Sequence, residues 1–318
     1  MPNEFELIEK YFLPLSGPEA LSLKDDAACF TPPAGFDLVV TKDLLLEGVH
    51  FREQDPVASI ASKALAVNVS DCVAKGAVPH LYWLGLAMPA RPGDDWLASF
   101  SDGLRAAQQI FGCRLAGGDT TKTNGPLTIS ITLCGLVPSG MMLARSGARA
   151  GDDVYVTGTL GDGALGLWCL ENNRAEFDSL VSAYREPQPA ISVGVELAND
   201  IASAGADVSD GLIADVGHLA RGSKVQITLY KDQLPLSQQA GQLLTEKPDL
   251  DWMQWAGGDD YQIVFTAAAK NREQINALAS STRTRISRIG TVEKGSGVQL
   301  LDKHGEIMQV RREGYIHF

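Results

Sequence analysis

Apolar positions recur along the chain at two spacings, and these predict helices and strands in alternation. In EFELIEKYF, Phe5, Ile8 and Phe12 fall at helical spacing and predict a short helix. Longer patterns of the same kind predict helices in PVASIASKALAVNVSDCVAKGA and DDWLASFSDGLRAAQQIFG. Runs rich in β-branched and aromatic residues predict strands in AACFTP, FDLVVTKDLL, HLYWLGLAMP, CRLAGG and PLTISITLCGLV.

The alternation starts again after the polar, glycine-containing turn RSGARAGD. We expect helices near residues 164–170 and 191–201 and in LIADVGHLARG, and strands in DVYVTG, ADVS, KVQITLY, YQIVFT, RISRIGTV and GVQLLD. Both halves mix strands with helices, which predicts an α+β (mixed α/β) fold of two domains. We place an N-terminal domain at residues 1–138, a join at 139–150 and a C-terminal domain at 151–318.

Composition narrows the class of protein and its partners. Of the 318 residues, 45% are hydrophobic and 21% are charged, as in a soluble globular protein. The formal charge of −12 argues against a nucleic-acid or anionic-membrane partner. No apolar run approaches the length of a membrane span, and the acidic, amphipathic start does not resemble a signal peptide. The five cysteines form no CxxC pair, so we expect a cytoplasmic protein.

The most informative pattern is a series of aspartates beside strand-like runs. Aspartate is depleted inside strands, and α/β folds gather ligand groups where strands end. The series comprises Asp25, Asp26, Asp43, Asp71, Asp119, Asp207, Asp210, Asp259 and Asp260. Several carboxylates would suit Mg²⁺ ions that bridge a nucleotide, and phosphoryl transfer needs no nucleophilic side chain. A single such aspartate is more often a helix cap or a turn residue, and Ser209–Asp210–Gly211 fits a helix cap equally well.

The ordered motifs together resemble the thiamine-monophosphate kinases, a family related to aminoimidazole ribonucleotide synthetase and selenophosphate synthetase. The resemblance spans nearly the whole chain and rests on DLLLEGVHF, KALAVNVSDCVAKGA, GGDTT, RSGARAGD, VYVTGTLGD, DVSDGLIADVGH, GGDDY and the closing EGYIHF. It implies transfer of the γ-phosphoryl group of ATP to thiamine monophosphate, giving thiamine diphosphate and ADP. It also implies a homodimer formed through the N-terminal sheet, and a C-terminal domain that closes a cleft.

The resemblance also assigns roles to individual residues. It implies several Mg²⁺ ions, held by Asp26, Thr41, Asp43, Asp71, Asp119, Asp207 and Asp210. ATP would contact Gly118, Asp119, Arg145 and Ser209, and thiamine monophosphate would contact His50, Asp259 and Tyr315. Asp119, Asp210 and Arg145 would contribute most to catalysis. Gly117 and Gly118 would let the backbone approach the ATP phosphates, because glycine has no Cβ.

Three positions depart from the residues that are common in this family. Lys24 stands where glycine is common, and Lys42 stands where serine or threonine is common. Asp259 replaces a glutamate and is one methylene shorter. We therefore expect activity with an altered Mg²⁺ dependence, with Lys42 reaching either a phosphate or a carboxylate.

Two alternatives stay open at the level of the sequence. The chain could be another ATP-dependent enzyme of the same superfamily, or a protein that binds ATP and Mg²⁺ without turnover. The selenophosphate synthetases would have a reactive cysteine in an N-terminal glycine-rich loop, and no such loop is present here. The intact set of carboxylates favours a kinase over a protein that has lost activity.

Overall fold

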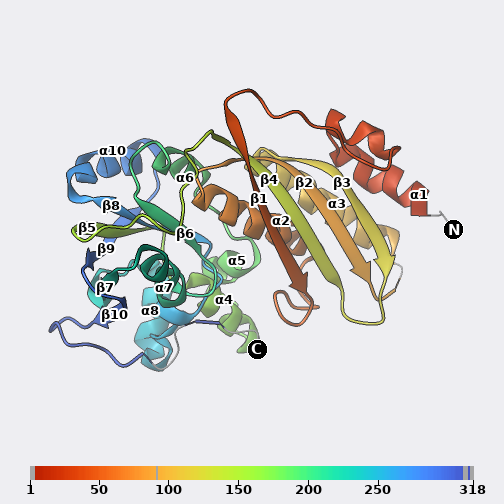
Figure 1. Cartoon of the computed structure of the whole chain (residues 1–318). Helices are drawn as coiled ribbons and strands as arrows, with labels where there is room; N and C mark the ends of the chain where they lie inside the picture. The colour runs from red at the N-terminus through yellow and green to blue at the C-terminus, as the bar shows by residue number, and fades with distance from the viewer. Residues whose placement is uncertain (1–3, 91, 311–313, 316–318) are drawn as a thin grey trace. The chain divides into compact units, whose positions relative to one another are not determined.

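A computed structural model describes residues 4–90, 92–310 and 314–315 and divides the chain into two compact units (Figure 1). Unit 1 comprises Met1–Cys72 and Ala77–Gly140, and unit 2 comprises Val73–Gly76 and Met141–Phe318. Each unit has its own sheet and its own helices, which confirms the predicted mixed fold of two parts.

Unit 1 is a four-stranded sheet covered on one face by two long helices (Figure 1). The strand order is β1 (Phe36–Leu46), β4 (Thr128–Pro138), β2 (Val78–Met88) and β3 (Arg114–Lys122), and only the β2–β3 pair is parallel. The helices are α2 (Val57–Ala74) and α3 (Asp94–Phe111), preceded by α1 (Glu4–Leu7) and three short helical turns at Ile8–Phe12, Leu13–Leu15 and Pro18–Leu23.

Side chains of the unit 1 strands alternate between a buried face and an open face. On β4, Ile129, Ile131 and Leu133 are fully buried, and the residues between them are partly exposed. This period of two is the expected pattern for a sheet with one covered face. Helix α2 is apolar and long enough to cross a membrane, but 78% of it is buried inside the structure, as in a core helix of a soluble fold.

Unit 2 is a six-stranded sheet in the order β10, β7, β9, β5, β8, β6, antiparallel except for the β10–β7 pair. The strands are β5 (Asp152–Thr157), β6 (Ala204–Val208), β7 (Gln226–Tyr230), β8 (Gln262–Ala268), β9 (Ile286–Glu293) and β10 (Gly297–Leu301). The helices are α4 (Asp162–Glu171), α5 (Asp178–Arg185), α6 (Ile191–Leu197), α7 (Leu212–Ser223), α8 (Gln238–Glu246), α9 (Met253–Ala256) and α10 (Arg272–Thr282).

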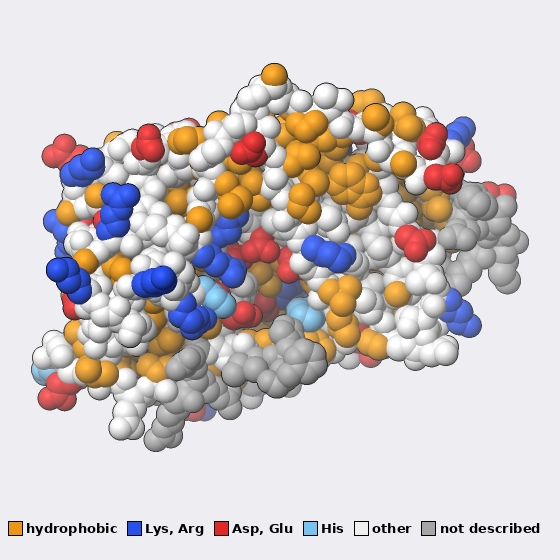
Figure 2. Space-filling view, viewed as in Figure 1, with side chains coloured by type: hydrophobic (Ala, Val, Ile, Leu, Met, Phe, Trp, Pro, Cys, Tyr) orange, Lys and Arg blue, Asp and Glu red, His pale blue; other side chains and the backbone are white. Residues whose placement is uncertain are grey.

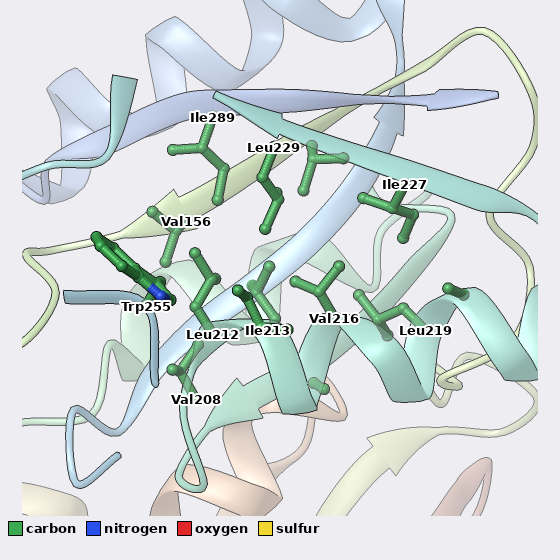
Figure 3. Packing of buried hydrophobic residues seen from close by; sticks show 14 of the residues in the cluster. Val156, Val208, Leu212, Ile213, Val216, Leu219, Ile227, Leu229, Trp255 and Ile289 are labelled. Carbon is green, nitrogen blue, oxygen red and sulfur yellow. The ribbon is translucent and has the colours of Figure 1, made fainter. Parts of the chain in front are cut away.

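Helix α7 forms the centre of the larger core in unit 2. Figure 3 shows Val216 and Leu219 of this helix facing Ile227 and Leu229 of β7, and all four side chains are fully buried. Burying an aliphatic side chain contributes roughly 1.5–3 kcal/mol. The orientation of α7 is therefore strongly fixed, together with the loops at its two ends.

Most of the predicted elements are present, and the differences have local causes. The predicted strand AACFTP is wrong, because residues 27–33 form no regular structure. Pro32 and Pro33 lack the N–H groups that a strand needs, and the N–H group of Cys29 donates to the carbonyl of Glu19 instead, at 2.9 Å. Helices α5, α8, α9 and α10 were not predicted.

A buried carboxylate attaches α10 to the sheet of unit 2. Asp153 of β5 is 2% exposed and accepts hydrogen bonds from Arg272 at 2.6 and 2.8 Å and from Arg288 at 3.4 Å. The hydrogen bond from Arg272 is the main cause that lowers the pKa of Asp153 below its ordinary value of 3.8. The carboxyl group of Asp153 therefore binds a proton less tightly in the folded state than in the unfolded state. The pairing stabilises the protein above about pH 3.8, and this stabilisation is lost as the pH falls through the lower folded pKa.

We expect Asp153→Asn to lower the free energy of unfolding by about 1–2 kcal/mol at pH 7, a value that allows for the exposure of both arginines. Urea unfolding between pH 7 and pH 3 measures this difference, which should shrink toward the acid end. Glu176→Gln, which removes an exposed partner of Arg174, serves as the control and should change little. A loss in Asp153→Asn that is constant across this range would contradict the account.

Candidate active site

Unit 1 contains a cavity of about 460 Å³ on the open face of its sheet. Its charged lining comes from Asp25 and Asp26 in the loop before β1, Asp119 on β3 and Lys42 on β1. Its apolar lining includes Ile8, Phe12, Ala20, Leu23, Leu115 and Ala116. Leu115 and Asp119 lie opposite Tyr82 and Gly85 of β2, which are three residues or about 10 Å apart because β3 has a bulge here, so the lining is apolar near the start of β3 and acidic further along it.

The strand register explains why Lys42 and Asp119 share this face. Lys42 lies opposite Thr132, which lies opposite Trp83, and the next row joins Ser130, Gly85 and Asp119. Residues opposite each other in paired strands point to the same side of a sheet. The alternation along β1 therefore sends Lys42 to the open face, and sends Thr41 and Asp43 to the face covered by the helices.

Packing within the sheet explains why glycine occupies the two positions before Asp119. A Cβ atom on Gly117 would lie 3.1 Å from the ring of Trp83, and one on Gly118 would lie 2.0 Å from the carbonyl oxygen of Leu84. A side chain at Gly118 would therefore force β3 away from β2. The contact of Gly118 with ATP stays a prediction, and the packing of the strands already requires glycine there.

A second group of predicted ligands surrounds Asn68 of α2. The Thr41 hydroxyl donates to the Asn68 carbonyl at 3.1 Å, and the Asp43 N–H group donates to the Asn68 side-chain oxygen at 3.1 Å. Asp71 lies three residues after Asn68 and therefore on the same face of α2. The His50 Nδ1 atom accepts from the Leu46 N–H group at 3.0 Å, which fixes the ring on the loop after β1. Asn68 is fully buried and holds this part of β1 against α2.

In unit 2, the Ser209–Asp210 loop is held by a carboxylate that the sequence analysis did not select. Asp215, in the first turn of α7, is 2% exposed and accepts from the N–H groups of Ser209 at 3.1 Å and Asp210 at 3.2 Å. Burial and the charge of Asp210 raise the pKa of Asp215 to about 7, whereas the two N–H groups and the charge of Arg145 oppose this rise. The Ser209–Asp210 loop is therefore not only a cap of α7. A side chain of α7 itself, Asp215, also holds the loop by two hydrogen bonds.

The GGDDY segment contributes two aspartates with different surroundings. Asp259 has a left-handed backbone with φ of 62°, and its Oδ1 atom accepts from the Tyr261 hydroxyl at 2.9 Å. Asp260 is buried and accepts from the N–H groups of Gly161 at 2.8 Å and Gly163 at 3.3 Å. Burial raises the pKa of Asp260 well above its ordinary value. Asp260 therefore connects this segment to the turn before α4, and Asp259 stays the predicted contact for substrate.

The other predicted residues of unit 2 are joined to the same helix and loop by hydrogen bonds of their backbone segments. The Ser223 hydroxyl, at the end of α7, accepts from the N–H groups of Gly147 and Ala148, both at 3.1 Å, and donates to the Arg145 carbonyl at 3.5 Å. The Tyr315 N–H group donates to the Asp210 carbonyl at 2.9 Å. The remainder of the closing motif, at positions 313 and 316–318, lies outside the described residues.

The structure therefore gathers the predicted residues into three local groups. Unit 1 holds one group in the cavity and one around Asn68, and unit 2 holds the third around α7, where Asp207 is a buried residue of β6. Within the ranges that the structure describes, no three His, Cys, Asp or Glu side chains converge as a complete metal-binding cluster. Sequence reasoning missed Asp215, Ser223 and the buried role of Asp260. The sequence offered one indication of the role of Asp215, which is that this acid follows Asp210 by five residues.

Comparison with known proteins places both units in one family. The model of the AIR synthase related protein N-terminal domain matches residues 24–137, and the model of the C-terminal domain matches residues 149–303. The thiamine-monophosphate kinase of Caulobacter vibrioides is 36% identical over 322 residues, which cover 99% of this chain and 91% of that protein. The enzyme of the same name from Escherichia coli K12 is 36% identical over 325 residues, which cover 99% of this chain and 98% of that protein.

Solved structures agree with these matches. The crystal structure of thiamine-monophosphate kinase from Stenotrophomonas maltophilia K279a has a TM-score of 0.83 and 39% identity, covering 90% of this chain and 91% of that one. The structure of AaThiL complexed with AMPPCP and TMP has a TM-score of 0.80 and 30% identity, and the match covers 99% of this chain and 97% of that one.

We expect Asp215→Ala to loosen the Ser209–Asp210 loop, because two partly buried N–H groups lose their acceptor at a cost of about 1 kcal/mol each. Hydrogen–deuterium exchange of a peptide that covers residues 207–213 should accelerate by at least about tenfold. Ser237→Ala removes the acceptor of the Ala240 N–H group at the start of α8 and serves as a matched control. Its exchange should accelerate at the start of α8 and at the start of α4, where the Ser237 hydroxyl donates to Asp162 at 2.7 Å, but not in residues 207–213. Unchanged protection of residues 207–213 in Asp215→Ala would contradict the assigned role.

Proposed function

The chain belongs to the thiamine-monophosphate kinase family, and we propose that it transfers the γ-phosphoryl group of ATP to thiamine monophosphate. A phosphate oxygen of thiamine monophosphate attacks the γ-phosphorus, and the bond from that phosphorus to the β–γ bridging oxygen breaks. The products are thiamine diphosphate and ADP, in the last step of thiamine diphosphate synthesis. AaThiL was solved with AMPPCP and TMP, which match the proposed donor and acceptor.

The observation that carries this proposal is the divided lining of the unit 1 cavity. Its apolar part, which includes Phe12 and Leu115, suits a nucleobase, and its acidic part, with Asp26 and Asp119, suits phosphates that carry metal ions. The apolar and acidic parts of the lining lie about 10 Å apart along β3, a separation that one nucleoside triphosphate can span. Cations that neutralise the phosphates and the acids would favour binding of such an anion to a protein with a formal charge of −12.

The donor set fits magnesium. Asp25, Asp26 and Asp119 provide carboxylate oxygens in one cavity, and Mg²⁺ is usually held by a few carboxylates together with substrate phosphates. We propose that Mg²⁺ ions are held by these acids and by the other predicted ligands, namely Thr41, Asp43, Asp71, Asp207 and Asp210. When bound, Mg²⁺ would neutralise the phosphate charge and polarise the γ-phosphoryl group.

The remaining residues of the chain bind and orient the reactants. Arg145 presents a planar cation that can bind phosphate oxygens in pairs, and Ser209 adds a hydroxyl from the loop that Asp215 holds. Asp259 offers a negative charge to the positively charged thiazolium ring, and His50 and Tyr315 contact the same substrate. The acceptor phosphate is largely ionised near neutral pH. The transfer is therefore direct and in line, without a general base or a phosphoenzyme.

We further propose that the enzyme is a cytoplasmic homodimer that associates through the unit 1 sheet, along the part of its open face that lies outside the cavity lining. Phe36, Leu38, Val40 and Leu44 of β1 are between 42% and 60% exposed on this face. Figure 2 shows apolar side chains gathered over this part of unit 1. Contiguous exposed apolar surface is typical of protein interfaces. The five cysteines are free thiols, as a reducing compartment would keep them.

Turnover tests the proposed function directly. Purified protein is incubated with ATP, Mg²⁺ and thiamine monophosphate, and ADP and thiamine diphosphate are followed by chromatography, with thiamine as the control acceptor. We expect equal amounts of ADP and thiamine diphosphate, and no product from thiamine. Binding of ATP and Mg²⁺ without thiamine diphosphate would favour a relative with another acceptor or a binding protein without turnover.

Substitution of the predicted metal ligands should lower turnover far more than substitution of a substrate contact. We expect Asp119→Asn and Asp210→Asn to lower kcat by about 10²–10³-fold, because each removes a charge that stabilises the transferring group. His50→Ala should cost about tenfold or less, mainly in KM for thiamine monophosphate. Steady-state kinetics at saturating Mg²⁺ measures both effects. Wild-type turnover in Asp210→Asn would rule out its proposed role.

A further inference from the structure

The unit 1 cavity that contains the acids also contains one cationic side chain. Lys42 is the one lysine or arginine among the described residues that line it, whereas Asp25, Asp26 and Asp119 are its acids. The side chain of Lys42 is exposed on the open face of β1. The chain thus places a positive charge in the same cavity as the carboxylates that would hold metal ions, separated from Asp119 on the sheet by two strands.

Neutral hydroxyls, not carboxylates, hold the ammonium group of Lys42. Its Nζ atom donates to the Ser130 Oγ atom at 2.6 Å and to the Thr132 Oγ1 atom at 3.4 Å, both on the neighbouring strand β4. Both hydroxyls also line the cavity. Among the described residues, no ion pair neutralises Lys42. The two hydroxyls therefore orient the charge without cancelling it.

One N–H group of the Lys42 ammonium is left to donate to an anion. An ammonium group has three N–H donors, and Ser130 and Thr132 accept from two of them. A phosphate oxygen suits the third, because a lysine binds phosphate as a compact point charge. The strand register fixes the base of Lys42 in the row that contains Trp83 and Gly117, next to the row that contains Asp119.

We propose that Lys42 is a phosphate-binding residue of this cavity and contacts an oxygen of the β- or γ-phosphate of the nucleotide. The inference rests on the proposed function, because it takes a nucleoside triphosphate as the ligand. Lys42 supplies from the protein itself part of the positive charge that metal ions would otherwise provide. The contribution of Lys42 to binding therefore grows with the number of phosphates on the nucleotide.

The test compares ATP, ADP and AMP in isothermal titration calorimetry with Mg²⁺ present. The variants are Lys42→Met, which keeps the aliphatic stem, and Lys42→Arg, which keeps the charge. The control is Lys122→Met, at the exposed end of β3 and outside the cavity lining. We expect Lys42→Met to weaken ATP binding by at least tenfold and AMP binding by less than twofold. Lys42→Arg should recover part of the loss, and Lys122→Met should bind all three nucleotides like the wild type.

Two outcomes would overturn the proposal. The first is unchanged ATP affinity in Lys42→Met, and the second is an equal loss for all three nucleotides, which a change in sheet packing would produce. Ser130→Ala gives an independent check, because it removes the acceptor at 2.6 Å and should weaken ATP binding several-fold without affecting AMP. Thiamine diphosphate formation by the wild type separates this inference from the proposed function. An active wild type with unchanged ATP affinity in Lys42→Met contradicts the role of Lys42 alone, and a wild type that binds no ATP contradicts both.

Discussion

Electrostatic repulsion is the constraint on which the proposed chemistry depends. Asp25, Asp26 and Asp119 line a cavity in a chain with a formal charge of −12, and the proposed ligands are two phosphate anions. Opposing anions at contact distance repel by several kcal/mol in a partly buried site. The acids are therefore useful only as holders of cations. The same reasoning gives a role to Lys42, which the strand register places on the same face of the sheet as Asp119.

The proposed chemistry also requires that the polar side chains of unit 2 that would contact ATP and substrate are held in fixed positions. Apart from Asp207 of β6, the predicted residues of unit 2 lie on loops, and α7 holds two of these loops, one at each end of the helix. Asp215 binds the N–H groups of Ser209 and Asp210, and Ser223 binds the segment that follows Arg145. The helix itself is fixed by its buried apolar face (Figure 3). Burial of ordinary aliphatic residues thus determines where the functional groups stand.

The sequence predicted the regular elements better than the environments of single residues. Strand β1 and helix α2 follow directly from apolar periodicity, whereas the strand predicted in AACFTP is wrong, because Pro32 and the adjacent Pro33 lack N–H groups. Periodicity does not reveal that Asp260 is buried against the turn before α4 while Asp259 is not, since that difference depends on tertiary packing. Asp215 was missed for the same reason. The assignment of metal ligands came from resemblance to a family, and their geometry around an ion stays a prediction.

The dependence of ATP binding on Mg²⁺ tests the central claim most directly. Calorimetric titration of the wild-type protein with ATP is carried out in EDTA and at increasing Mg²⁺ concentrations, with Asp119→Asn measured in parallel. The account predicts that affinity rises by at least about 100-fold with Mg²⁺, because the ions neutralise both the carboxylates and the phosphates, and that Asp119→Asn depends on Mg²⁺ much less. Equal affinity with and without Mg²⁺ would contradict the claim that the acids of the cavity hold the ions that bind ATP.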